Sequence, residues 1–326
     1  MKFGSESPKI CHVEVTEKCN LRCPHCYNAQ RTPETISWEN LNNTIRELVE
    51  NKVEHVIITG GEPLSAIKQT CHLADQSIKW GMTNSLNSNL TLATPEIARR
   101  LKEAGVQHCL TTLNGSTDET ITRMTGVNGT LPKIIEGVRN MQEAGIRVTA
   151  NLILNEHNKS EVVSTGILAK SMGINKFLAN RTIFGYLVGK DDAQRMFDDL
   201  LLLQKFGLEV QTCRMVPECL FDDLDKYKPF INRGCSAGRK HLLLNINGDA
   251  HACVHELKSY GNIHEIGIKG VWENMGEWRD DKYVPEECKD CGRLESCNGG
   301  CRMVALACTG RMDGSDNLSC YSRKMG

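Results

Sequence analysis

Short apolar segments alternate with amphipathic segments along the first two thirds of the chain. Apolar runs that predict β-strands occur at residues 10–15, 55–59, about 82, 106–113, 147–154 and 176–179. Helical spacing of apolar positions starts at about Trp38 and recurs at residues 65–79, 95–104, 131–144, 159–172 and 191–206. This alternation predicts an α/β fold of parallel strands joined by right-handed crossovers. About six units are visible, fewer than the eight of a closed barrel.

The pattern changes at about Cys213, where helical periodicity fades and cysteines become frequent. A hairpin is predicted at residues 242–254, with its turn at Asn247-Gly248. Residues 280–320 have the character of a loop and need something other than an apolar core to order them. We therefore predict two domains, residues 1–212 and residues 213–326.

Composition narrows the possible functions. The 326 residues carry a formal net charge of −1, which gives no electrostatic reason to expect binding to nucleic acid or to a membrane surface. No apolar run reaches the length of about 18 residues that a membrane span needs, and the first residues lack the apolar core of a signal peptide. The sequence thus predicts a cytoplasmic protein. Its 16 cysteines would be reduced there, which favours metal binding over disulfides.

Three cysteines near the start of the chain carry the most specific signal. Cys19, Cys23 and Cys26 have the spacing Cys-x3-Cys-x2-Cys at the end of the first predicted strand. Iron–sulfur clusters are normally held by four cysteines, so three thiolates would leave one iron of a cubane open to a small molecule. A zinc knuckle, or three unrelated buried cysteines, is the alternative interpretation.

This motif, followed by Gly60-Gly61-Glu62-Pro63 after the second predicted strand, resembles the radical SAM superfamily. The resemblance implies a partial (β/α)6 TIM-like barrel in which S-adenosylmethionine binds the open iron of a [4Fe–4S] cluster. One electron, from a donor such as flavodoxin or ferredoxin, then yields a 5′-deoxyadenosyl radical that abstracts hydrogen. By the same resemblance, cysteines 19, 23 and 26 are the catalytic cluster ligands. The implied cofactor-binding residues are Tyr27, Gly60, Gly61, Glu62, Pro63, Asn84 and Thr112.

A second group of cysteines resembles the SPASM domain, which binds two auxiliary [4Fe–4S] clusters in a small loop-rich domain. The pattern consists of Cys235, Cys253, Cys288, Cys291, Cys297, Cys301 and Cys320. The resemblance assigns residues 235, 253 and 301 to the first auxiliary cluster, and residues 288, 291, 297 and 320 to the second. Two full clusters need an eighth ligand. We expect Cys219 to complete the first cluster, and Cys213 or an open iron is the alternative to Cys219. A pair of structural zinc sites is the alternative to the two auxiliary clusters.

The SPASM resemblance implies a ribosomally synthesised precursor peptide as the substrate, modified by a cross-link, an epimerisation or a backbone excision. Cys19 stands too close to the start of the sequence for a leader-binding domain to precede it, so a separate leader-recognition protein is expected. One alternative is radical tailoring of haem or another small-molecule cofactor. A zinc-binding, non-catalytic interaction protein is the alternative from a different class.

Overall fold

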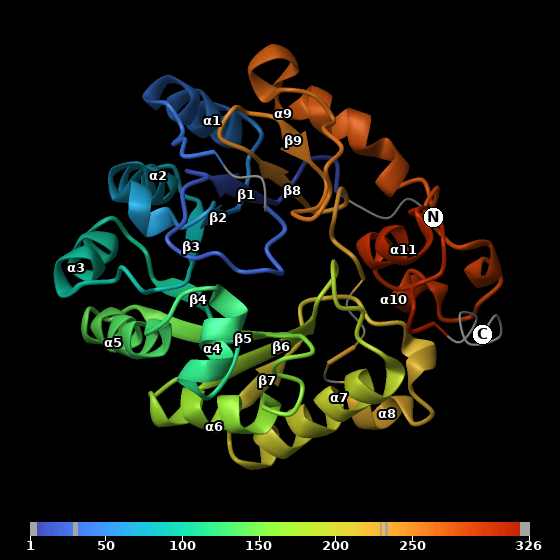
Figure 1. Cartoon of the computed structure of the whole chain (residues 1–326). Coiled ribbons are helices and arrows are strands. Elements are labelled where there is room, and N and C mark those ends of the chain that lie inside the picture. Colours follow the sequence, from blue (N-terminus) through green and yellow to red (C-terminus); the bar gives the residue numbers. More distant parts are fainter. Residues whose placement is uncertain (1–4, 29–31, 229, 232–233, 320–326) are drawn as a thin grey trace. The chain divides into compact units, whose positions relative to one another are not determined.

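The computed structural model describes residues 5–28, 32–228, 230–231 and 234–319 (Figure 1). The chain divides into two compact units that are interleaved in sequence. The first unit contains residues 1–112, 125–149 and 236–280. The second unit contains residues 113–124, 150–235 and 281–326.

The first unit is built on parallel strands. In its part of the sheet the strand order is β4-β3-β2-β1-β8-β9. These strands are β1 (Ile10–Glu14), β2 (His55–Thr59), β3 (Thr83–Ser88), β4 (His108–Thr112), β8 (His241–Leu244) and β9 (Ala250–His251). Only the β8–β9 pair is antiparallel among the pairs whose register is described in this unit. Strand β5 (Arg147–Leu154) begins in the first unit and ends in the second.

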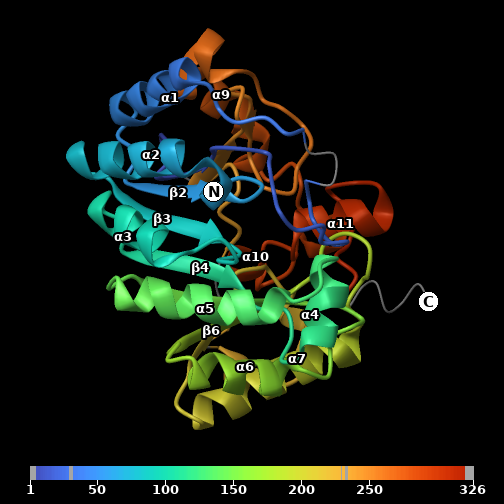
Figure 2. The same cartoon turned by 60° about the vertical axis from the view of Figure 1, so that its left-hand side comes forward.

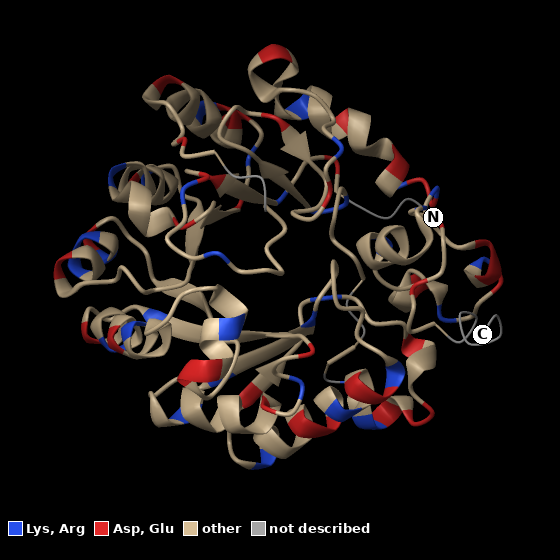
Figure 3. Ribbon diagram, in the orientation of Figure 1, with Lys and Arg blue, Asp and Glu red and all other residues tan. Residues whose placement is uncertain are grey.

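Helices cover one face of these strands, as Figures 1 and 2 show for α1, α2 and α3. The helical elements of the unit are α1 (Trp38–Glu50), η1 (Pro63–Ala66), α2 (Ile67–Lys79), α3 (Pro95–Glu103), α5 (Thr130–Glu143), α9 (Ile263–Asn274) and η3 (Met275–Trp278). Ser37 and Thr94 begin α1 and α3 by accepting backbone N–H groups of the first turn, which stabilises a helix start. Leu41, Ile45 and Leu48 form the buried face of α1. Charged residues lie mainly on the helices and rarely on the strands (Figure 3).

The second unit contains the end of β5, β6 (Lys176–Arg181) and β7 (Glu209–Gln211), in the order β5-β6-β7. Its helical elements are α4 (Asp118–Thr125, whose last residue falls in the first unit), α6 (Val162–Ser171), α7 (Lys190–Lys205), η2 (Glu218–Leu220), α8 (Leu224–Tyr227), η4 (Glu286–Cys288), α10 (Leu294–Cys297) and α11 (Arg302–Thr309). Rings of Phe221, Tyr227 and Phe230 pack against Phe197 of α7. This aromatic cluster fixes the segment that leads into the later cysteines.

The predicted fold class is confirmed: the protein is a mixed α/β fold with a parallel sheet. Two local predictions differ from the structure. Residues 280–320 were expected to be loop-like, yet α11 forms there because Met303, Val304 and Ala305 are buried. The other concerns β3, which was expected as a short strand around Met82 but extends from Thr83 to Ser88.

The units do not follow the predicted boundary between residues 212 and 213. Residues 236–280 group with the first unit because β8 pairs in parallel with β1, with Leu244 beside Val13. Helix α9 packs on α1, and the Glu47 carboxylate accepts the Ile268 N–H at 2.7 Å.

No helix among the described residues is long and apolar enough to cross a membrane.

Candidate metal centre and cofactor site

The loop after β1 carries Cys19, Cys23 and Cys26, all three half-buried. The Leu21 backbone N–H donates to Cys19 Sγ at 3.5 Å, and the side-chain amide of Asn89 lies 4.0 Å from the same sulfur. Hydrogen bonds to sulfur are a common way to stabilise and tune cluster ligands. The three predicted cluster cysteines therefore share one loop at the carboxyl end of a parallel strand, the edge at which barrel folds place their active sites.

Gly60 and Gly61 hold this loop by close backbone contact. Gly61 N–H donates to the Thr16 carbonyl and Glu62 N–H donates to the Lys18 carbonyl, each at 2.6 Å. A Cβ on Gly60 would lie 2.3 Å from the Thr16 carbonyl oxygen, and one on Gly61 would lie 2.2 Å from that of Lys18. Only glycine allows this approach, so the Gly-Gly pair sets the position of the cysteine loop.

The Glu62 side chain turns inward rather than toward an open pocket. It is 1% exposed and accepts hydrogen bonds from Leu64 N–H at 3.0 Å, Ser88 Oγ at 2.7 Å and Asn89 N–H at 2.8 Å. Burial raises the pKa of its carboxyl, while these three donors oppose that rise. Glu62 thus ties the Gly-Gly turn to the end of β3, next to the Asn89 amide that faces Cys19. The sequence predicts Glu62 only as part of the cofactor turn, and its contacts with the end of β3 are seen only in the structure.

A third segment, at the end of α4, contacts the cysteine loop. Arg22 N–H donates to the Thr125 carbonyl at 2.8 Å, and a Cβ on Gly126 would come within 2.8 Å of the Arg22 carbonyl oxygen. This contact was not predicted from the sequence.

Thr112 and Asn84 lie at opposite edges of the first unit's sheet. Thr112 ends β4 at the same edge as Ser88, which pairs with Thr111. Asn84 lies near the start of β3, where it lines a cavity with His55 and His108, and its amide donates to the Ala74 carbonyl at 3.1 Å.

Asn84 was predicted to line the cofactor pocket, but it lies at the opposite end of β3 from Ser88, which donates to Glu62 beside the cysteine loop. The sequence indicated only a short strand near Met82, which put the end of that strand several residues too early. Ser88 and Asn89 occupy the strand end instead.

Tyr27 joins the cysteine loop to two other residues of the first unit. Its hydroxyl donates to Glu14 Oε1 at 3.3 Å, and its ring centroid lies 5.3 Å from that of His255. Glu14 ends β1 and is 4% exposed, and burial raises the pKa of its carboxyl to about 7, against the hydrogen bond from Tyr27. An acidic residue at the carboxyl end of a predicted strand is the sequence signal that could have identified Glu14.

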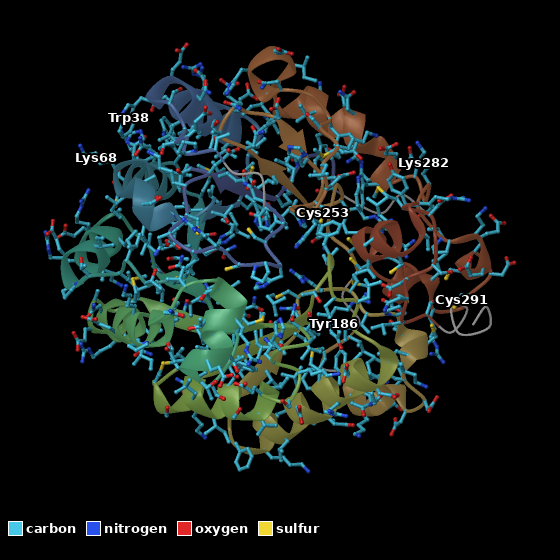
Figure 4. All side chains as sticks on the ribbon, in the orientation of Figure 1. Trp38, Lys68, Tyr186, Cys253, Lys282 and Cys291 are labelled. Atoms are coloured by element: carbon cyan, nitrogen blue, oxygen red, sulfur yellow. The ribbon has the colours of Figure 1, made fainter. Side chains whose placement is uncertain are left out.

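Cys253 follows β9 in the first unit, and its sulfur lies 4.0 Å from Nδ1 of His255 (Figure 4). The remaining described cysteines of the SPASM pattern lie in the second unit. Cys320, predicted for the second auxiliary cluster, is outside the described residues.

A cavity of about 300 Å³ in the second unit brings several cysteines together. Its lining includes Cys219, Cys288, Cys291 and Cys297, together with Ser319. Glu218 N–H donates to Cys297 Sγ at 3.4 Å. Burial raises the pKa of Cys297, while backbone N–H groups of Glu218, Gly299 and Gly300 lower it and so favour the thiolate. A cysteine-lined cavity of this size, with N–H groups directed at one sulfur, fits an iron–sulfur cluster.

Cys219 was expected to complete the first auxiliary cluster. The structure instead places it on the cavity of the second set, with Cys288, Cys291 and Cys297. Cys219 belongs to the short helix η2, which begins at Glu218. Because the Glu218 N–H donates to Cys297 Sγ, this helix lies beside the cysteines of the second set. The other candidate, Cys213, is exposed and does not line this cavity.

No three Cys, His, Asp or Glu side chains in the searched part of the chain converge as a single metal ion requires. A cubane does not need such convergence, because each thiolate binds a different iron at a different corner. The residues of both units fit clusters of this kind, with the Gly60–Gly61 contact and the 300 Å³ cavity as the observations that support the fit.

Comparison with known families gives two matches. The radical SAM superfamily matches residues 13–167, and the iron–sulfur cluster-binding SPASM domain matches residues 235–292. The first match contains the cysteine loop, Gly60–Gly61 and Thr112. The second contains Cys235, Cys253, Cys288 and Cys291.

Full-length relatives of two kinds are similar to the chain. The PqqA peptide cyclase of Granulibacter bethesdensis is 25% identical, covering 95% of this chain and 87% of the relative. The AdoMet-dependent heme synthase of Methanosarcina barkeri is 24% identical, covering 94% of each protein. The fold is also that of Streptococcus suis SuiB, whose crystal structure with bound S-adenosylmethionine matches 97% of this chain and 78% of that one, with a TM-score of 0.79 and 18% identity. SuiB has also been solved with its precursor peptide SuiA.

Proposed function

Because this chain is a radical SAM enzyme with a SPASM domain, we propose that it abstracts hydrogen from a ribosomally synthesised precursor peptide and so installs a post-translational modification. The observation that carries the proposal is the cysteine loop held by Gly60–Gly61, in a chain that is similar over nearly its whole length to a peptide cyclase. The class of modification, whether cross-link, epimerisation or backbone excision, is left to the experiment below.

A [4Fe–4S] cluster at Cys19, Cys23 and Cys26 would supply the electron that cleaves S-adenosylmethionine into methionine and a 5′-deoxyadenosyl radical, the species that removes hydrogen from the substrate. The chain's own residues position this chemistry. Gly60 and Gly61 fix the backbone of the cysteine loop, and Glu62 joins that turn to the end of β3. Thr112 offers a hydroxyl at the same strand edge.

Tyr27 follows Cys26 in the chain, and its hydroxyl donates to the Glu14 carboxylate. We propose that the Tyr27 ring contacts the adenine, as the family resemblance implies, while its other contacts to Glu14 and His255 fix the ring's orientation.

We further propose two auxiliary [4Fe–4S] clusters. Cys288, Cys291, Cys297 and Cys320 hold the second, and the shared cavity supports this for the described members. Cys235, Cys253 and Cys301 hold the first, a proposal that rests on the spacing pattern. Since Cys219 lies with the second set, either Cys213 or an open iron that a small ligand can reach completes the first cluster.

The peptide proposal is tested with reduced enzyme, S-adenosylmethionine and the short peptide encoded beside its gene, with and without a neighbouring candidate leader-binding protein. A change in the peptide that depends on S-adenosylmethionine supports the proposal; it is read as a mass change or, for an epimerisation, which leaves the mass unchanged, as deuterium taken up from D2O. A greater yield with the partner supports separate leader recognition, since holding the leader raises the effective concentration of the core peptide.

Radical tailoring of haem is the second candidate, favoured by the similarity to a heme synthase. The same reaction with an iron porphyrin in place of the peptide separates the two. Conversion of the porphyrin, with no change in any candidate peptide, would assign the haem-type function.

A further inference from the structure

Two cysteines of the first auxiliary set have their backbone amides held by buried polar side chains. Cys235 N–H donates to Asn298 Oδ1 at 3.1 Å, and Cys301 N–H donates to Asp316 Oδ2 at 2.8 Å. Cys235, Cys301, Asn298 and Asp316 all lie in the second unit. Neither Asn298 nor Asp316 is a predicted ligand, so this pattern calls for its own explanation.

Asp316 is fully buried and forms an ion pair with Arg181, which is 2% exposed. The pair is bidentate, with Nη1 donating to Oδ1 at 2.8 Å and Nη2 donating to Oδ2 at 2.5 Å. Arg181 is the last residue of β6, and it also donates to the Met215 carbonyl at 2.7 Å. A bidentate guanidinium–carboxylate pair fixes the carboxylate in direction as well as in place.

The Asp316 carboxylate has little freedom to move. It also accepts Leu318 N–H at 3.0 Å, and a Cβ on Gly300 would lie 2.6 Å from Oδ2. The oxygen that receives Cys301 N–H is thus packed directly against the residue before Cys301. Replacing both partners of a buried ion pair by apolar groups is often neutral or stabilising, so a contribution to stability does not by itself account for this pair.

Asn298 supports Cys235 in a comparable way. It follows Cys297 and takes a left-handed conformation with φ 48°, which turns its side chain out of α10. Its side chain is largely buried, at 7% exposure. Outside glycine this conformation is tolerated best by Asn and Asp.

We propose that Asn298 and Asp316 are the positioning residues of the first auxiliary cluster, with Arg181 orienting Asp316. They hold the backbone of Cys235 and Cys301 so that both thiols face one cluster. This inference rests on the proposed function only in assuming that a first auxiliary cluster exists.

Two variants test the proposal without leaving a buried charge. Arg181→Met with Asp316→Leu removes the ion pair and the acceptor together, since replacing both partners of a buried pair by apolar groups is often tolerated. Asn298→Gly removes the other acceptor and keeps the left-handed backbone, and Asn298→Asp restores an acceptor. The control is Lys176→Met with Glu209→Leu, which removes an ion pair between the start of β6 and the start of β7 whose side chains are 34% and 62% exposed.

The readouts are iron per chain and the electron paramagnetic resonance of each reduced cluster after anaerobic reconstitution. Wild type and the control should hold about twelve irons. The double variant and Asn298→Gly should lose about a third of that iron, together with one cluster signal, and keep the other two signals. Asn298→Asp should recover the lost signal.

Each contrary result has a separate meaning. Folded variants that keep all three signals unchanged would overturn the positioning role while leaving the proposed function intact. Loss of the second cluster instead of the first would also overturn it. Wild type with only about eight irons would overturn both this inference and the proposed cluster count.

Discussion

At the scale of single residues, Gly60 and Gly61 determine whether the cysteine loop can close on β2. Gly61→Ala would place its Cβ 2.2 Å from the Lys18 carbonyl oxygen and 2.4 Å from that of Glu17. Overpacking of this kind costs about 1–3 kcal/mol, and the displaced segment is the one that leads into Cys19. We expect the variant to lose the iron of the catalytic cluster, measured as iron per chain and by spectroscopy. Gly189→Ala is the matched control, because a Cβ there meets no atom within 4 Å.

Glu14 gives the residue-scale prediction for pH. Burial raises the pKa of its carboxyl from 4.5 to about 7 in the folded protein, the neighbouring Glu17 adds to the rise, and the Tyr27 hydroxyl opposes it. The folded pKa of Glu14 lies above its unfolded pKa, so the folded state binds the proton more tightly. The contribution of this carboxyl to the free energy of unfolding is therefore complete below about pH 4.5 and is lost as the pH rises through about 7. Glu14→Gln should therefore raise the free energy of unfolding at pH 8 by up to about 3 kcal/mol and change it little at pH 5.

Denaturant titrations of wild type and Glu14→Gln at the two pH values provide the measurement. Glu119→Gln, on the surface of α4, should show no such pH dependence, since 75% of that side chain is exposed. An equal difference between wild type and Glu14→Gln at pH 5 and pH 8 would contradict the assignment.

At the scale of elements, β8 is part of the first unit although it lies far along the chain. Leu244 is fully buried, beside Val13 of β1 and opposite Ala250 of β9. Leu244→Ala should cost about 2–5 kcal/mol and should speed hydrogen exchange in β1 as well as in β8. Leu257→Ala, at a position 90% exposed, should change neither the free energy of unfolding nor the hydrogen exchange of β1 and β8. Fast exchange confined to β8, with β1 unchanged, would show that the two strands do not form one cooperative element.

The repeating strands and helices could be predicted because each buries one apolar face, and the residues of that face lie within a short stretch of sequence. The α1 prediction was accurate for this reason, with Ser37 as its cap and Leu41, Ile45 and Leu48 inside. The pairing of β8 with β1 could not be predicted, because contacts between residues more than 200 positions apart leave no local pattern. The α11 helix was missed because its buried Met303, Val304 and Ala305 span less than a full turn of periodicity.

For the candidate site, spacing identified the cysteines but not what holds them. The close contacts of Gly60 and Gly61 with the cysteine loop are seen only in the folded chain. Asn84, predicted to bind the cofactor, lies near the start of β3, because that strand extends beyond its predicted end. The supports of the cysteines, Glu62, Asp316 and Asn298, are single polar residues whose burial appears only in the folded chain. A spacing pattern therefore predicts the cysteines of a cluster more readily than the polar side chains that hold their backbone in place.

At the scale of the whole molecule, the account requires three clusters with separate ligands. Cys219→Ala tests the assignment of one thiol, because Cys219 lines the cavity of Cys288, Cys291 and Cys297. We expect this variant to alter the signal of the second auxiliary cluster and to leave the first unchanged. A change confined to the first cluster would restore the role that the sequence pattern gave to Cys219.

Cys19, Cys23 and Cys26 are proposed to hold the cluster that cleaves S-adenosylmethionine. The most direct measurement is the 5′-deoxyadenosine formed by reduced, reconstituted enzyme in which all three residues are replaced by alanine. We predict that cleavage is abolished while about eight irons per chain remain bound at the auxiliary sites. Cys71→Ala, on α2 and outside both cysteine sets, should cleave S-adenosylmethionine as wild type does. Undiminished 5′-deoxyadenosine formation by the triple variant would contradict the account.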